Sequence, residues 1–78
     1  MKKSEIDSQI AEDLKHIPRE VKGSPQNHLR MYYAPLRRHD LTKTTKTKEE
    51  TLKEAILQVR KKFPNFTPKY DKNYFKNL

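Results

Sequence analysis

Apolar residues recur at helical spacing near the start of the chain. Successive members are four, four and three residues apart, which places them on one face of an α-helix. They are Ile6, Ile10, Leu14 and Ile17. Ser4 offers a hydroxyl N-cap, and Asp7 stands three residues later, where a capping box usually has Glu. Because Pro18 ends the pattern, the sequence predicts an amphipathic helix over about residues 5–16.

A second helical pattern occupies the later half of the chain. Its apolar positions again fall on one helical face. They are Leu52, Ala55, Ile56, Val59 and Phe63. Thr47 and Glu50 form a capping box of the preferred Thr-x-x-Glu type, and Pro64 follows the last apolar position. Acidic residues lie in the first turn and basic residues in the last, as the helix dipole favours. We therefore predict a helix over about residues 48–63.

The middle of the chain, about residues 18–47, lacks a clear helical period and is predicted to be a flexible basic segment. Proline, glycine, serine and asparagine cluster in its first part, which is typical of a linker. Residues 28–33 then alternate polar and apolar side chains, which favours a short strand. Pro35 either ends that strand or opens a short helical turn that reaches Leu41. The sequence leaves this choice open.

An aromatic tail closes the chain. Between residues 64 and 78, tyrosines and phenylalanines alternate with lysines, and two prolines flank the first aromatic residue. Such aromatics could stack on unpaired bases, but the favoured interpretation is that they dock the tail onto the core. The fold class that follows is mainly α, in one small domain with two amphipathic helices, one short strand and this tail.

Length and composition limit the classes of function. A chain of 78 residues with 36% charged side chains has a thin core, so a homodimer that pools two cores is plausible. The absence of cysteine excludes a disulfide scaffold, a zinc finger and a thiol nucleophile, and it fits a reducing cytoplasm. Acids early in the chain argue against a signal peptide, and no apolar run could span a membrane. We expect a cytoplasmic protein with no membrane association.

Positive charge is concentrated in residues 21–48. Seven basic residues and one acid make this segment +6 of the total +8. Arginine donates in a planar fork to phosphate or to guanine, and tyrosine can stack on a base. The segment thus predicts nucleic-acid binding, with duplex DNA favoured over single strands and over RNA because it presents the densest phosphate array. The candidate binding residues are Arg30, Tyr32, Arg37, Arg38, Lys43, Lys46 and Lys48. This hypothesis requires the cations to converge on one surface rather than to engage the acids of the first helix.

A different class of function also fits this charge. A small inhibitor or adaptor could dock its basic face on an acidic, nucleic-acid-handling enzyme, because complementary charge serves both kinds of partner. Residues 28–33, followed by helical sequence, resemble the strand of ribbon-helix-helix repressors, but the segment after them is too short for the first of the two helices that such a unit needs. A helix-turn-helix is equally disfavoured, because no short turn joins two periodic helices.

Catalysis, metals and cofactors find little support in the sequence. Of its three histidines, only His16 has an acid, Asp13, at the helical spacing that metal ligands need. The position of His16 at the end of a predicted helix is sufficiently explained by the helix dipole, which favours a cation there. A single glycine cannot build a phosphate loop or a dinucleotide fingerprint. We therefore expect a regulatory or accessory protein that performs no turnover and needs no cofactor or metal.

Overall fold

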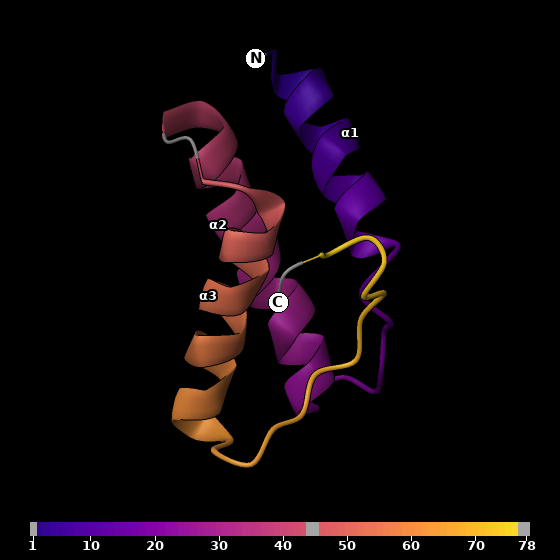
Figure 1. Cartoon of the computed structure of the whole chain (residues 1–78), viewed down its shortest axis with the longest axis vertical. Helices are drawn as coiled ribbons and strands as arrows, with labels where there is room; N and C mark the ends of the chain where they lie inside the picture. The colour runs from indigo at the N-terminus through magenta and orange to yellow at the C-terminus, as the bar shows by residue number, and fades with distance from the viewer. Residues whose placement is uncertain (1, 44–45, 77–78) are drawn as a thin grey trace.

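Three helices form most of the chain in the computed structural model, which describes residues 2–43 and 46–76. They are α1 (Lys3–Leu14), α2 (Pro25–Lys43) and α3 (Lys48–Lys62). α2 packs against both α1 and α3 (Figure 1). The tail, residues 63–76, leaves the end of α3 and returns toward the end of α1 (Figure 1). The protein is therefore mainly helical, as predicted.

The two predicted helices are confirmed, with one correction to how the first begins. α3 starts at the capping box: the Glu50 amide donates to Thr47 Oγ1, and the Thr47 amide donates to Glu50 Oε1, both at 3.2 Å. α1 instead begins at Lys3, with Lys2 as an N-cap that makes no side-chain bond. The proposed cap at Ser4 is therefore wrong, because Ser4 already lies inside the first turn.

The strand predicted at residues 28–33 is wrong, because these residues belong to α2, and no strand occurs in the described part of the chain. The inner positions of α2 do follow a helical period, but three of the five are polar. They are Gln26, Leu29, Tyr33, Arg37 and Asp40. A search for apolar periodicity misses such a face. Pro35 lies within α2 on its exposed side, where it removes one backbone hydrogen bond without ending the helix.

The core lies between α2, α3 and the tail. Its fully or nearly fully buried apolar residues come from all three segments and from the loop after α1. They are Ile17, Leu29, Tyr33, Leu52, Ala55, Ile56, Val59 and Phe75. Phe75, only 1% exposed, meets the rings of Tyr33, Tyr70 and Tyr74 edge to face. The predicted docking of the aromatic tail on the core is thus confirmed.

The loop from residue 15 to residue 24 reverses the chain between α1 and α2. Gly23 adopts a φ of 88° there, a left-handed conformation that a side chain makes costly. The longest helix, α2, follows inside the segment that was predicted to be flexible. No helix in residues 2–43 and 46–76 has the length and apolar character needed to cross a membrane.

Candidate anion-binding groove

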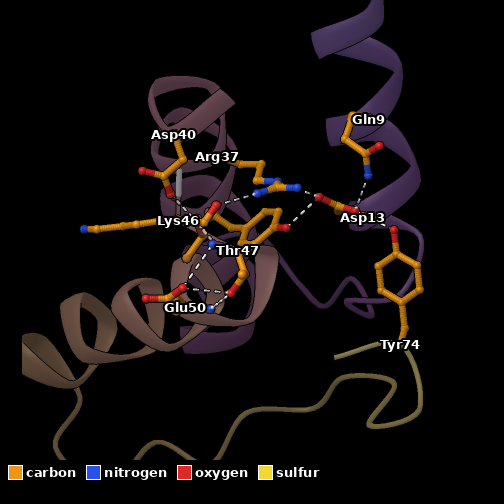
Figure 2. Close-up of polar contacts among 10 residues, drawn as sticks. Gln9, Asp13, Arg37, Asp40, Lys46, Thr47, Glu50 and Tyr74 are labelled. Carbon is orange, nitrogen blue, oxygen red and sulfur yellow. Dashed lines mark hydrogen bonds and ion pairs between the residues drawn. The ribbon is translucent and has the colours of Figure 1, made fainter. Parts of the chain in front are cut away.

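A buried carboxylate, Asp13 of α1, joins three segments of the chain (Figure 2). It accepts hydrogen bonds from the Tyr33 hydroxyl at 2.7 Å and from Arg37 Nε at 3.1 Å, both on α2. The Tyr74 hydroxyl of the tail donates to it at 2.5 Å, and Gln9 Nε2 of its own helix donates at 3.0 Å. Four donors and one positive charge compensate the desolvation of this carboxylate.

One of the predicted binding residues, Arg37, is buried beside Asp13. Arg37 is 8% exposed, and its guanidinium also donates to the Lys46 carbonyl at 3.4 Å, so little of it is open to a phosphate in solvent. Burial and the bond to Asp13 raise the pKa of Tyr33, and the same two causes raise the pKa of Tyr74 to about 12. Both hydroxyls therefore remain donors at neutral pH. Arg37 has a structural role.

Arg30 is also engaged inside the fold. Its Nη1 donates to the carbonyl of Leu14, the last residue of α1, at 2.6 Å and to the carbonyl of Ile17 in the loop that follows. A cation at this end complements the helix dipole. Burial, with a smaller contribution from the charge of Arg19, lowers the pKa of Arg30. Arg30 thus fastens α2 to the end of α1.

The remaining predicted residues are divided among separate contacts. Arg38 pairs with Asp7 of α1 at 2.6 Å, Lys46 pairs with Glu54 of α3 at 3.0 Å, and Lys48 Nζ lies 3.5 Å from the centre of the Tyr74 ring. The bond to Glu54 raises the pKa of Lys46. Tyr32 is half-buried against His28, and Lys43 is exposed at the end of α2. Among these residues, the adjacent Arg37 and Arg38 engage acids of the first helix.

A different cationic surface exists between α3 and the tail. There the chain forms a groove of about 360 Å³ whose lining includes three cations, one tyrosine, several apolar groups and no acid. Its lining residues are Lys53, Ile56, Leu57, Arg60, Thr67, Pro68, Tyr70 and Lys72. Lys53, Leu57 and Arg60 are spaced by four and three residues, so they share one face of α3. The tail contributes the opposite wall.

Hydrogen bonds hold the tail wall in place. Gln26, buried on α2, donates through Nε2 to the Lys69 carbonyl at 2.8 Å and accepts from the Lys69 amide at 2.9 Å. The same nitrogen donates to the Pro18 carbonyl at 3.0 Å. On the α3 side, Arg60 Nε donates to the Phe66 carbonyl at 3.2 Å. The groove is therefore built from a helix and an anchored segment rather than from a loose terminus.

The charge of this groove is uncompensated within the described residues. Neither Lys53, Arg60 nor Lys72 forms an ion pair there, whereas nearby acids are already engaged. Those acids are Glu54 with Lys46, Glu20 with Lys69 at 3.4 Å, and Asp71 with His16 at 3.1 Å. Three cations therefore surround a groove whose described lining residues include no carboxylate, and Glu54 and Asp71 beside them are engaged with other partners.

Sequence reasoning overlooked this groove because each part of it had a sufficient structural explanation. The bases late in α3 matched the helix dipole, and the tail aromatics were assigned to docking. One signal was available: Leu57 lies off the buried stripe of α3, is 54% exposed, and has Lys53 and Arg60 one turn away on either side. An apolar residue between two cations on an outer face marks a surface worth testing.

Comparisons with protein-family models, with curated proteins and with solved structures found no match for this chain. Among the residues that the structure describes, no three histidine, aspartate or glutamate side chains lie together as metal ligands would. His16 stacks on Tyr74, with ring centres 3.8 Å apart, and pairs with Asp71 rather than with Asp13. The groove between α3 and the tail combines three cations with an exposed apolar residue and an aromatic ring, which is the composition of a binding surface.

Proposed function

We propose that this chain is a non-catalytic nucleic-acid-binding protein that acts as a regulatory or accessory factor in the cytoplasm, and that it binds through the groove between α3 and the tail. The observation that carries the proposal is the set of three unpaired cations, Lys53, Arg60 and Lys72, around a groove with no acidic lining residue. Within the basic segment at residues 30–48, Arg37 and Arg38 already pair with acids, and the segment adds to the overall positive field.

The physical basis is the release of counterions. A protein cation that neutralises a nucleic-acid phosphate frees a condensed counterion, and this favours binding of any sequence. The net charge of +8 also attracts polyanions at long range and increases the rate of encounter. Arg60 is suited to contact a phosphate directly, because its Nε is already held by the Phe66 carbonyl and its two terminal nitrogens remain available.

The salt dependence of binding tests this proposal. Fluorescence anisotropy with labelled single-stranded DNA, duplex DNA and RNA is measured from about 50 to about 200 mM salt. If three phosphates are neutralised, the logarithm of the association constant should fall with the logarithm of salt concentration with a slope of about −2 to −3. The proposal is contradicted if none of the three nucleic acids binds at the lowest salt concentration, or if added salt does not weaken the binding.

An acidic protein partner is the second candidate, and the exposed Leu57 between two cations is the observation that favours it. Interfaces with proteins commonly place an apolar anchor within a polar rim. Affinity purification before and after nuclease treatment separates the two candidates. Nuclease treatment releases a partner that is bridged by nucleic acid, whereas an enzyme that this chain binds directly remains in the purified complex.

A further inference from the structure

We infer that the groove between α3 and the tail binds a single-stranded nucleic acid, with an unpaired base against its apolar floor and the flanking phosphates at its cationic rim. This inference rests on the proposed function and specifies the form of nucleic acid that the site accepts. In this arrangement Leu57 and Tyr70 contact the base, and the phosphates are neutralised by three cations. These cations are Lys53, Arg60 and Lys72.

The floor of the groove has the character that a base requires. Ile56, Leu57 and Pro68 supply apolar surface, and Tyr70 adds an aromatic ring whose position is fixed by its edge-to-face contact with Phe75, with ring centres 6.0 Å apart. A base offers two flat, weakly polar faces, and contact with aromatic or apolar side chains stabilises it once it is unpaired. A simple inorganic anion would gain nothing from these residues.

The size and shape of the groove favour a single strand over a duplex. Pockets that enclose one small organic ligand measure roughly 300 to 1,000 Å³, and this groove, at about 360 Å³, has room for a group on the scale of one base. Duplex DNA is read by helices or ribbons that protrude into its grooves, and its bases are stacked and paired inside. A concave site therefore suits a base that has left the stack, as in single-stranded loops and ends.

The rim has the charge to hold the backbone on either side of that base. Lys53 and Arg60 stand on α3, and Lys72 stands on the tail, so cations flank the floor from both walls. Both walls are connected to the rest of the fold. α3 is held by its buried face, and the tail is held by the two hydrogen bonds between Gln26 and the Lys69 backbone. A site that exists before binding loses less entropy when it binds.

The test compares a single strand with an abasic strand of the same charge and length, and with two polyanions that offer no unpaired base. Anisotropy titrations use a single-stranded oligonucleotide, the same strand with abasic sites, the corresponding duplex, and poly-glutamate. The full chain should bind the normal strand at least about fivefold more tightly than the abasic strand, because contact between a base and an aromatic group is worth that factor or more. The duplex and poly-glutamate should bind more weakly than the normal strand.

Two pairs of variants locate the binding. Lys53→Gln with Lys72→Gln removes two rim charges, and Lys22→Gln with Lys43→Gln removes two exposed charges that do not line the groove. The rim pair should reduce the salt slope by about 1.4, and the control pair should leave it nearly unchanged. Leu57→Ala should reduce the preference for the normal over the abasic strand, whereas Met31→Ala, at an equally exposed apolar residue on α2, should not.

The outcomes separate this inference from the proposed function. If the chain binds all nucleic acids equally, the proposed function stands and the assignment of an unpaired base to the groove is overturned. If both lysine pairs weaken binding alike, nucleic-acid binding stands, but its location in the groove is overturned and this inference falls with it. If no nucleic acid binds, both proposals fail, and tight binding of poly-glutamate then points to an acidic protein partner. Circular dichroism spectra of the variants establish that each one is folded.

Discussion

Arg37 of α2 and Arg60 of α3 lie on amphipathic helices of the same small domain, yet the fold places them in opposite environments. Arg37 is buried beside Asp13, and Arg60 lines an open groove. The difference originates in the inner faces of the two helices. Three of the five buried positions of α2 are polar, whereas four of the five in α3 are apolar. Arg37 and Asp40 of α2 are therefore drawn into the fold, whereas the buried positions of α3 include no charged residue.

The polar inner positions of α2 connect it to its neighbours. Gln26 binds the backbone of the tail, Arg37 binds α1, and Asp40 accepts a hydrogen bond from Thr51 of α3. Each of these side chains is buried, so losing its partner would cost more than losing a surface contact. A dense run of basic residues in a sequence therefore does not by itself define a basic surface.

The largest effect should come from separating Arg37 and Asp13. Arg37→Ala leaves the Asp13 carboxylate buried without a countercharge, which should lower the free energy of unfolding by about 3–5 kcal/mol. Because a small domain has only about 5–15 kcal/mol in total, this is a substantial loss. Urea denaturation followed by circular dichroism measures it. The neighbouring Arg38→Ala is the matched control, since its exposed pair with Asp7 should contribute only about 0–1 kcal/mol. Equal losses in the two variants would refute the division between buried and exposed cations.

A smaller effect should follow from releasing the tail. Gln26→Ala leaves the Lys69 amide and carbonyl without their partner on α2, which should cost about 1–3 kcal/mol. The same variant should weaken nucleic-acid binding although it changes no charge, because the tail forms one wall of the groove. Denaturation and anisotropy on one preparation measure both quantities. Undiminished binding by a destabilised but folded variant would show that the tail wall is dispensable.

The smallest effect should appear only at alkaline pH. Burial and the bond to Asp13 raise the pKa of Tyr74 to about 12, whereas an unfolded tyrosine ionises near 10. The folded state thus holds this proton more tightly, and the resulting stabilisation is complete below about pH 10 and is lost as the pH rises toward 12. Thermal melts at increasing pH should show a shallower alkaline decline for Tyr74→Phe than for the unaltered chain. Parallel declines would contradict the role assigned to this hydroxyl.

Part of the fold was accessible from the sequence because its signals are local. The capping box at Thr47 and Glu50 and the apolar period of α3 act over three or four residues, and both are present in the structure. α2 escaped prediction because Gln26, Arg37 and Asp40 occupy inner positions that a search by hydropathy assigns to solvent. The candidate site escaped for a related reason: its walls, α3 and the tail, are brought together by long-range contacts such as the hydrogen bonds between Gln26 of α2 and the Lys69 backbone.

By itself, the sequence determined the net charge, the helical class, the docking of the aromatic tail, and the existence of α1 and α3. Only the tertiary structure decided which cations reach solvent. Asp13 selects Arg37, 24 residues away, and Tyr74, 61 residues away, and such choices depend on how helices pack. Helix formation is governed by neighbours along the chain, whereas the exposure of a charge depends on which buried partner desolvates and neutralises it. For that reason Arg37, from the segment with the highest charge density, stabilises the fold, whereas the cations that line the groove face solvent.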